Sequence, residues 1–408
     1  MQYIFICYAV PHSMVEKNKA VSVPGNKLAL LFADCFKEVC DKLTCLTIPP
    51  QKASLRSKPH NSVLNGKALA PGIDTVEVEY FNFPIIKHLS IAMGVFSKLQ
   101  NIIKNSPEKD ICVITVNSNS CVSLPTLLLK RKHQFKTVIF LSDMPFDENH
   151  ITGFLRKLVR ALDNKIRVAA LKSYDGCITG VDLMREEYFP DKKTVRIDPA
   201  VEVDGYNREI QKLGPLYRQE KETVDIVYTG SLNSNYNIPT LIQVAHELPS
   251  HYRMIFYGRG EFCEFVENEA EKSEKIIYGG YLDSQQIKAV QVRADVLITL
   301  LDTAKNISKY AVPSKIYDYL CTGVPVITSD VLSVPEEIRE FTTVVDDHSA
   351  ADIKEKILKI TMEPVERELA RSKAGQAREY IIKNCNWAVQ HDRIIQYMSE
   401  FNKEHYHE

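Results

Sequence analysis

The sequence has little of what marks membrane-spanning, secreted or nucleic-acid-binding proteins. Its 408 residues carry a formal net charge of −1 and include a single tryptophan, Trp387. No apolar run approaches the ~20 residues that a membrane-spanning helix needs. No signal peptide is expected either, because residues 1–10 are apolar but have no basic segment before them. The composition, 45% hydrophobic and 25% charged, is that of a soluble globular protein, and the length predicts two domains.

The ten cysteines are scattered and form no Cys-x-x-Cys pair. Most lie inside apolar segments, so we expect free, buried thiols in a reducing cytosol rather than disulfides or metal ligands. The acidic cluster at Asp346-Asp347-His348 is interpreted as a solvated loop. No metal site is therefore predicted.

Charge is divided unevenly between the two halves of the chain. Residues 1–200 hold 27 Lys and Arg against 19 Asp and Glu, a net +8, whereas residues 201–408 have a net −9. Cations are dense over residues 151–172, where they alternate with large apolar side chains. Such a helix could rest on an anionic membrane, or it could be a solvated helix with an ordinary buried stripe. Nucleic acid is not expected as a partner, since no recognition motif appears.

Short apolar strands alternate with helix-periodic segments almost throughout, which predicts parallel sheets covered on both faces. A polar stretch over residues 204–223 is interpreted as a linker between two such units, and residues 386–401 as a terminal amphipathic helix. Ligands of these sheets bind at the carboxyl ends of the strands. The expected strands are residues 3–10, 43–48, 76–81, 111–116, 137–141, 174–179, 194–197, 225–228, 252–257, 276–278, 296–300, 324–328 and 343–345.

The most informative segment is residues 311–327. Pro313 is well placed for the first turn of a helix, whose free amides and positive dipole end attract anions. Lys315 adds a full charge there, and Ser314 and Asp318 are one turn apart on the same face. A diphosphate could sit on the helix end while Asp318 accepts hydrogen bonds from a ribose. The alternative is a capped helix whose Lys and Asp merely face solvent.

These residues, together with several glycine-containing turns, resemble the retaining family 4 of the GT-B glycosyltransferases. Asp318 to Val326 resembles that family's nucleotide-sugar helix, with Asp where the family usually has Glu. The Pro-Ser-Lys opening is similar to a branch of bacterial surface-polysaccharide transferases. Three other segments resemble parts of that family's donor domain. The segment that resembles the start of the domain contains Gly230 and Ser231, and the one that resembles its Gly-x-Gly turn contains Gly258. The third resembles the segment that faces the nucleotide base and contains Gly279 and Tyr281.

The resemblance implies an α/β protein of the GT-B fold. Two Rossmann-like, doubly wound domains would face each other across a cleft, and a C-terminal helix would cross back to the first. The expected domains are an acceptor-side domain over 1–205, a donor-binding domain over 206–385 and the cross-over helix over 386–408.

The sequence also departs from the family pattern. The first of two acidic residues in the family motif falls on Tyr310, and the family's Arg and Lys on the phosphates are replaced near Ser231 and Tyr236. The diphosphate charge must then be met by Lys315, Lys309 or Lys305 with the helix end. A divergent active enzyme and a catalytically dead scaffold both fit these losses, and we favour the active enzyme.

Four residues of the first domain are further candidates. Gly25 and Asn26 open a helix after the first strand and resemble the family's cleft loop, although a simple helix cap would look the same. His12 in the preceding loop and Asp143 after the strand at 137–141 also point toward a cleft. We predict His12 and Asp143, with Lys315, as catalytic candidates, while recognising that single loop residues are usually surface or capping groups.

The predicted activity is transfer of a sugar from a nucleotide-diphosphate donor, UDP- or GDP-linked, to a glycan or lipid-linked acceptor of a bacterial surface polysaccharide. Anomeric retention is what the resemblance implies. No cofactor or metal is expected, since a cationic helix end can replace Mg²⁺. The expected location is cytoplasmic, with peripheral attachment to the inner face of the plasma membrane through the basic domain. A nucleotide-sugar 2-epimerase and a non-catalytic partner subunit of the same fold remain alternatives.

Overall fold

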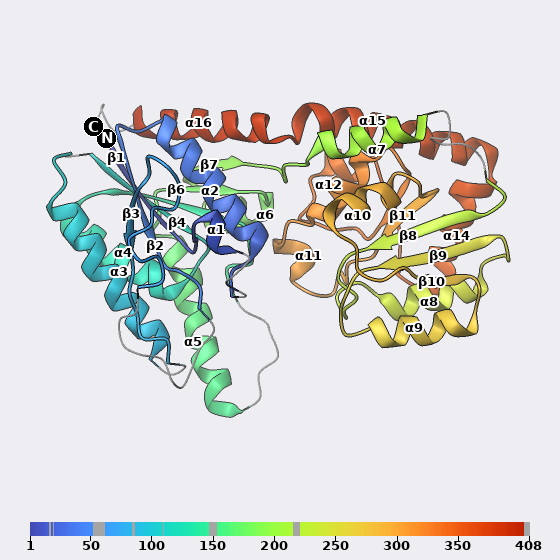
Figure 1. Cartoon of the computed structure of the whole chain (residues 1–408), viewed down its shortest axis with the longest axis horizontal. Helices are drawn as coiled ribbons and strands as arrows, with labels where there is room; N and C mark the ends of the chain where they lie inside the picture. Colours follow the sequence, from blue (N-terminus) through green and yellow to red (C-terminus); the bar gives the residue numbers. More distant parts are fainter. Residues whose placement is uncertain are drawn as a thin grey trace. The chain divides into compact units, whose positions relative to one another are not determined.

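The computed structural model describes residues 1–15, 18, 20–51, 62–83, 86–108, 110–146, 153–214 and 221–403. The chain divides into two compact units (Figure 1). Unit 1 comprises Met1–Ile197 and His391–Glu408, and unit 2 comprises Asp198–Gln390. The boundaries expected from the sequence fall after residues 205 and 385.

Unit 1 is built on one parallel sheet of seven strands in the order β3-β2-β1-β4-β5-β6-β7. The order reverses between β1 and β4, so the sheet is doubly wound, and Phe5 pairs in register with Cys45 on one side and Ile114 on the other. Central strands such as β1 are buried along their whole length, which is why they read as uninterrupted apolar runs. The strands are β1 (Gln2–Cys7), β2 (Lys42–Thr47), β3 (Asp74–Glu77), β4 (Ile111–Val116), β5 (Lys136–Leu141), β6 (Gly176–Thr179) and β7 (Lys193–Arg196).

Helices cover both faces of this sheet. Ile4 and Ile6 of β1 pack in one apolar cluster with α3 and α4, whereas the alternate residue Phe5 stacks edge-on against Phe36 of α2. The alternation follows from the period of two in a strand. The helices of unit 1 are α1 (His12–Val15), α2 (Val23–Glu38), α3 (Lys87–Lys104), α4 (Ser120–His133), α5 (Phe154–Leu171), α6 (Asp182–Tyr188) and, from His391 onward, α16 (Trp387–Lys403).

The C-terminal helix α16 completes unit 1. The Tyr397 hydroxyl donates to the Lys193 carbonyl at 3.0 Å, and the Asn402 amide donates to the Tyr3 hydroxyl at 2.6 Å. The helix approaches β6 so closely that a Cβ on Gly176 would lie 2.2 Å from the Tyr397 hydroxyl. The last helix therefore contacts β1, the first strand in the sequence, and also β6 and β7, the last two strands of this sheet.

Unit 2 has a second doubly wound parallel sheet, in the order β10-β9-β8-β11-β12-β13, which reverses between β8 and β11. Its strands are β8 (Val224–Thr229), β9 (Tyr252–Tyr257), β10 (Ile276–Tyr278), β11 (Val296–Thr299), β12 (Val326–Thr328) and β13 (Thr343–Val344). Its helices are α7 (Val203–Leu213), α8 (Ile238–Glu247), α9 (Cys263–Lys272), α10 (Ser284–Gln291), α11 (Ile307–Tyr310), α12 (Ser314–Cys321), α13 (Glu336–Arg339), α14 (Ala350–Met362) and α15 (Pro364–Asn384).

The fold class predicted from the sequence, two doubly wound α/β units, is confirmed. The interpretation of residues 204–223 as a linker is wrong for its first half, where α7 forms, while residues 215–220 lie outside the described residues. The helix forms because Tyr206 is buried in unit 2 and donates to the Gln291 side chain at 2.7 Å. All ten cysteines are free thiols, and eight of them are buried. Among the helices of the described part, none combines the length and apolar character needed to cross a bilayer.

Candidate functional site

Unit 2 contains a cavity at the carboxyl ends of β8, β9 and β10, beside the point where the strand order reverses. Its volume is about 360 Å³. This is the position at which doubly wound sheets bind ligands. Seven of the nine residues predicted for donor binding line it: Gly230, Ser231, Gly258, Tyr281, Ser314, Lys315 and Asp318.

Glycines let the loops after these strands pack backbone to backbone. The Gly230 amide donates to the Tyr257 carbonyl at 2.9 Å, and the Gly258 amide donates to the Gly280 carbonyl at 2.9 Å. A Cβ on Gly258 would lie 1.7 Å from the Gly230 carbonyl oxygen, and one on Gly279 would lie 2.0 Å from the Tyr257 ring. Gly279 does not line the cavity, but its missing side chain leaves room for Tyr257, which does.

Lys315 lies in an aromatic cage at the floor of this cavity. Its Nζ is 3.9 Å from the centroid of the Tyr236 ring and 4.3 Å from that of Tyr228, and it donates to the Tyr228 hydroxyl at 3.1 Å. That hydroxyl in turn donates to the Ser231 carbonyl at 2.6 Å. Burial lowers the pKa of Lys315 to about 7. No carboxylate among the described residues forms an ion pair with Lys315, so the cage holds an amine whose counter-charge is not supplied by the described protein.

Asp318 lies one turn further along α12 and also lines the cavity. Burial raises the pKa of its carboxyl to about 6, with the Lys288 ammonium opposing the rise and Glu202 adding to it. Lys288 itself is bound to Glu202 at 3.2 Å. No described residue donates a hydrogen bond to Asp318, so its oxygens are available to hydroxyl groups of a ligand.

A buried hydrogen-bond network fixes α12 against β8. The Tyr319 hydroxyl accepts a hydrogen bond from the Thr229 amide at 2.8 Å. The Thr229 hydroxyl accepts one from the Gln291 side chain at 2.8 Å, and Gln291 also accepts from Tyr206. Because every member has a partner, the network holds Lys315 and Asp318 in place on a rigid element.

Ser314 and Tyr310, both predicted to bind the donor, have surroundings that differ from those expected. Ser314 lines the cavity, but its amide donates to the Val312 carbonyl at 3.0 Å and so is already engaged. Tyr310 is the last residue of α11 and is not among the residues that line the cavity. The charge that faces the cavity from this region is therefore that of the Lys315 side chain.

Arg259 lines the cavity but is not among the residues predicted from the sequence. Its guanidinium lies 3.9 Å from the centroid of the Tyr281 ring, and both residues line the cavity. Tyr281 is 61% exposed, so one aromatic face and one cation are presented together at the rim. The signal was present in the Gly258-Arg259-Gly260 turn, where the arginine stands between two glycines.

Unit 1 has a cavity of its own at the carboxyl ends of β1, β4 and β5, with a volume of about 390 Å³. Asp143 lies at its edge and accepts a hydrogen bond from the Asn117 side chain at 2.7 Å. Asn117 has a left-handed backbone, with φ of 54°, and its side-chain oxygen accepts from the Ser142 amide at 2.8 Å. The Asn119 amide donates to the Tyr8 hydroxyl at 2.8 Å. Amides and hydroxyls therefore surround one carboxylate on part of the cavity wall, and the rest of the lining is largely apolar, including Leu28, Val116 and Phe140.

The other unit 1 candidates have local partners. Gly25 and Asn26 line this cavity, but the Gly25 amide donates to Ser22, the N-cap of α2. The Asn26 side chain is buried and bonds both to the amide and to the carbonyl of Val10, at 2.8 and 3.1 Å. His12 begins the short helix α1, is exposed and does not line the cavity.

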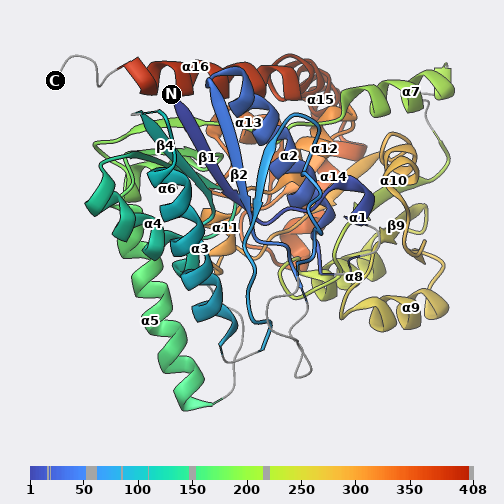
Figure 2. The same ribbon diagram turned by 60° about the vertical axis from the view of Figure 1, so that its left-hand side comes forward.

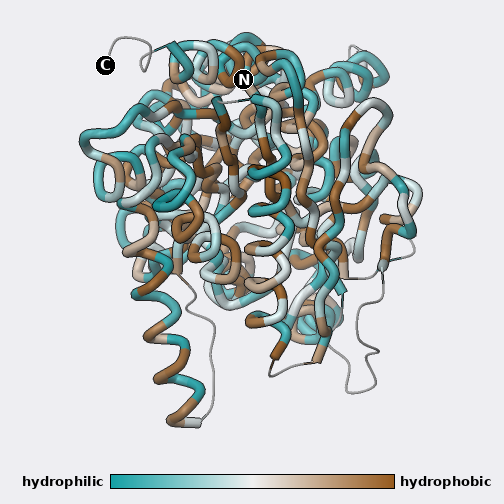
Figure 3. Tube along the Cα trace, turned by 90° about the vertical axis from the view of Figure 1, so that its left-hand side faces the viewer, coloured by the Kyte–Doolittle hydropathy of each residue, from teal (hydrophilic) through white to brown (hydrophobic). Residues whose placement is uncertain are grey.

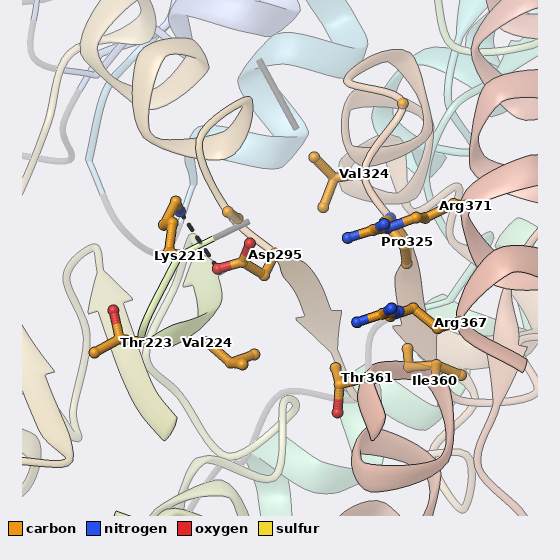
Figure 4. Close-up of a pocket in the computed structure, with 12 residues that line it drawn as sticks. Lys221, Thr223, Val224, Asp295, Val324, Pro325, Ile360, Thr361, Arg367 and Arg371 are labelled. Atoms are coloured by element: carbon orange, nitrogen blue, oxygen red, sulfur yellow. Dashed lines mark hydrogen bonds and ion pairs between the residues drawn. The ribbon is translucent and has the colours of Figure 1, made fainter. Parts of the chain in front are cut away.

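A third cavity, of about 160 Å³, lies in unit 2 at the amino ends of β8, β11 and β12. Figure 4 shows the side chains of Arg367 and Arg371 from α15 entering it opposite Asp295, which is bound by Lys221 at 3.3 Å. Parallel sheets of this kind take ligands at their carboxyl ends, so the cavity with Lys315 is the better candidate site. Among the described residues, no group of three or more His, Cys, Asp or Glu is placed to hold a metal ion.

Comparison with known structures shows that this chain has the GT-B fold of glycosyltransferases. The structure of Anabaena Alr3699/HepE in complex with UDP aligns with a TM-score of 0.64 at 11% identity, over 98% of this chain and 100% of that one. A glycosyltransferase from Rickettsia africae ESF-5 aligns with a TM-score of 0.62 at 14% identity, over 99% of both chains. WaaG, a glycosyltransferase involved in lipopolysaccharide biosynthesis, aligns with a TM-score of 0.58 at 15% identity, over 98% of this chain and 100% of that one. A search of curated proteins found no match.

The sequence of unit 2 also matches a family model over part of its length. Residues 217–380 match the family described as Glycosyl transferases group 1. That segment contains every residue of the cavity with Lys315 and Asp318. The predicted enzyme class, a glycosyltransferase, is confirmed.

Proposed function

We propose that the protein transfers a sugar from a nucleoside-diphosphate sugar, held in the unit 2 cavity, to a glycan or lipid-linked acceptor bound by unit 1. Transfer proceeds with retention and without a metal ion, in the synthesis of a surface polysaccharide on the cytoplasmic side of the plasma membrane. The similarity of fold to WaaG, described as acting in lipopolysaccharide biosynthesis, and to HepE, crystallised with UDP, supports the acceptor class and the donor class.

The observation that carries this proposal is the pairing of Lys315 with Asp318 in one cavity. A diphosphate supplies the negative charge that the caged amine lacks, and such charge-assisted hydrogen bonds are about twice as strong as neutral ones. Asp318, with no described donor of its own, accepts hydrogen bonds from ribose hydroxyls. A fixed cation near the leaving diphosphate stabilises the charge that develops there during transfer.

Lys315 also accounts for the cations that are missing from the loop after β8. A Cβ on Gly230 would lie 2.6 Å from the Lys315 Nζ, and the Tyr236 ring is the nearest face of the cage. The ammonium therefore lies directly beside the loop after β8. In the glycosyltransferase family that the sequence resembles, the phosphate-binding Arg and Lys come from this loop. One lysine from α12 replaces them, which favours an active enzyme over a dead scaffold.

Unit 1 supplies the acceptor side of the proposal. The amides and hydroxyls around Asp143 suit the hydroxyl groups of a sugar, and Asn117 fixes the carboxylate. Asp143 would orient the attacking hydroxyl of the acceptor. If it also accepts the proton of that hydroxyl as a general base, it contributes typically 10²- to 10⁴-fold to the transfer step.

The direct test is incubation of the purified protein with UDP- and GDP-linked sugars, with and without extracted surface glycan. We expect thermal stabilisation by one donor and release of nucleoside diphosphate only when acceptor is present, with the anomeric configuration of the product read by NMR. Interconversion of the nucleotide sugar without acceptor would identify an epimerase. Absence of any donor binding would leave the non-catalytic subunit as the function.

Asp318→Asn is expected to weaken binding of UDP about 5- to 10-fold, because a neutral amide accepts a ribose hydrogen bond less strongly than a carboxylate. Binding of 2′-deoxy-UDP, which lacks one of these hydroxyls, should weaken less, so the preference for the ribonucleotide should shrink. Titration calorimetry with both nucleotides measures this directly. An unchanged preference would restrict Asp318 to a structural role.

Asp143→Asn is expected to lower kcat for transfer by about 100-fold while leaving the affinity for the donor nucleotide unchanged. The variant keeps the hydrogen bond to Asn117 but loses the charge that orients the acceptor hydroxyl. Initial rates with saturating donor and acceptor measure the effect. A change in donor affinity of the same size would contradict the assignment of Asp143 to the acceptor side.

A further inference from the structure

Helix α5 leaves one face of large apolar side chains uncovered. Figures 1 and 2 show its first turns projecting from the rest of unit 1. Of its 18 residues only Ala170 and Leu171, at its end, are buried. The exposed fractions are 84% for Phe154, 71% for Leu155, 48% for Leu158, 58% for Val159, 53% for Leu162 and 39% for Ile166.

These six positions fall on one side of the helix, because most are three or four residues apart and at about 100° per residue they stay within one broad stripe. Figure 3 shows the resulting alternation of hydrophobic and hydrophilic turns along α5. A stripe of this kind is normally buried in a core, and its exposure marks a surface that interacts with another molecule or a membrane.

The polar side of α5 is cationic. Arg156, Lys157 and Arg160 lie in its first two turns, and the helix has no acidic residue in its first turn. Its one acid, Asp163, is bound to Arg167 at 2.6 Å and to the Ser120 hydroxyl of α4. These contacts turn the acidic residue toward the body of unit 1 and leave the exposed part of the helix apolar and basic.

The neighbouring helices also expose large apolar side chains. Helix α4 packs between α3 and α5. Leu89 and Met93 on α3 are 65% and 66% exposed, and Leu124 and Leu128 on α4 are 42% and 51% exposed. Three adjacent helices therefore present large apolar side chains to solvent.

We propose that this face, centred on Phe154–Leu162 of α5, inserts into an anionic lipid bilayer. A helix with an apolar stripe bordered by Lys and Arg lies in the plane of the membrane interface, with its apolar side among the acyl chains and its cations at the headgroups. The charge distribution selects lipid, since the cations bordering the stripe complement an anionic surface. Binding to lipid does not depend on the proposed function. The further conclusion that a lipid-linked acceptor reaches the protein at this face rests on the proposed function.

The experiment is flotation of the full-length protein with vesicles of phosphatidylcholine containing about one third phosphatidylglycerol, and with phosphatidylcholine alone. We expect the protein to float with the anionic vesicles at low salt. Salt of about 0.5 M should weaken the binding, because surface charges are screened beyond a few ångströms, but an inserted stripe should leave part of it. The triple variant Leu155→Ser, Leu158→Ser and Leu162→Ser should lose at least tenfold in bound fraction.

Two matched variants make the result specific. Val365→Ser with Leu369→Ser removes apolar side chains that are 80% and 48% exposed on unit 2, and it should float like the parent protein. Arg156→Gln with Lys157→Gln and Arg160→Gln should abolish the preference for anionic vesicles. Failure of the parent protein to float, or equal flotation of the serine triple variant, would overturn the proposal. So would a parent dimer in sedimentation that the serine variant lacks, because a second copy would then cover the stripe. Flotation uses no substrate, so its failure is distinct from failure of the proposed transfer reaction.

Discussion

Replacing Lys315 with methionine should weaken binding of UDP about 10- to 150-fold and leave binding of uridine nearly unchanged. The variant keeps the length of the side chain between Tyr228 and Tyr236 but removes the charge that a diphosphate would meet. Hydrogen bonds to charged groups are worth roughly 1.5–3 kcal/mol, which corresponds to this range of affinity. Calorimetric titration with UDP, UMP and uridine separates the phosphate contribution from that of the nucleoside.

The same lysine should make UDP affinity depend on pH. In the empty cage the pKa of Lys315 is about 7. A bound diphosphate favours the ammonium form and raises that pKa, so binding above pH 7 takes up a proton and affinity should fall by up to tenfold per pH unit. The second phosphate ionisation lies near pH 6, below this range. Lys315→Met should show no such slope between pH 7.5 and 9.

Stability should follow the opposite direction. Because burial lowers the pKa of Lys315 from 10.5 to about 7, the folded chain holds fewer protons than the unfolded chain between those values. The free energy of unfolding of the parent protein should therefore rise with pH over that interval, and Lys315→Met should lack the rise.

Lys309→Met serves as the control, since Lys309 does not line the cavity. Equal losses of UDP and uridine affinity, or the same losses in the Lys309 variant, would remove Lys315 from the phosphate site.

Gly258→Ala should destabilise the protein by about 3 kcal/mol or more and abolish nucleotide binding. The new Cβ would lie 1.7 Å from the Gly230 carbonyl oxygen, and the residue has φ of 147°, which side chains rarely adopt. Relief requires the loops after β8 and β9 to separate, and overpacking of this kind costs ~1–3 kcal/mol in addition to ~1–3 kcal/mol of backbone strain. For a domain of roughly 200 residues, thermal unfolding should fall by about 6–12 °C.

Gly280→Ala is the matched control for this prediction. Gly280 also has a positive φ, of 73°, but a Cβ there meets nothing within 4 Å. It should lose only ~1–2 kcal/mol for the left-handed conformation and retain nucleotide binding. Equal effects of the two substitutions would show that strain, and not the contact between the glycine loops, governs stability here.

The strands were predictable because both faces of each sheet are covered. β4 and β10 have the bounds expected from sequence, Ile111–Val116 and Ile276–Tyr278, since short buried apolar runs admit little else. Helix α7 was missed because its exposed face is polar and the burial of Tyr206 depends on Gln291, distant in sequence. Composition could not reveal that partner.

The candidate site was predictable in its residues but not in its chemistry. The spacing of Ser314, Lys315 and Asp318 indicated a phosphate-binding helix end, yet the Ser314 amide is occupied by Val312. The cage around Lys315 depends on Tyr228 and Tyr236, which are about 80 residues away in sequence and come close only through the β8–α12 packing. Similarly, the sequence of α5 does not show whether its apolar side is buried. In the structure α4 packs against the helix and the apolar side stays exposed.

Unit 1 is not continuous along the chain, and this affects how the protein is made. Tyr3 and Gly176 receive their packing partners Asn402 and Tyr397 from α16, more than 200 residues after β6 has been synthesised. A ribosome therefore releases the whole of unit 2 before it supplies the helix that completes unit 1. The first unit to begin folding is the last to finish, and until then the bare patch over β1 and β6 has to be protected from other nascent chains.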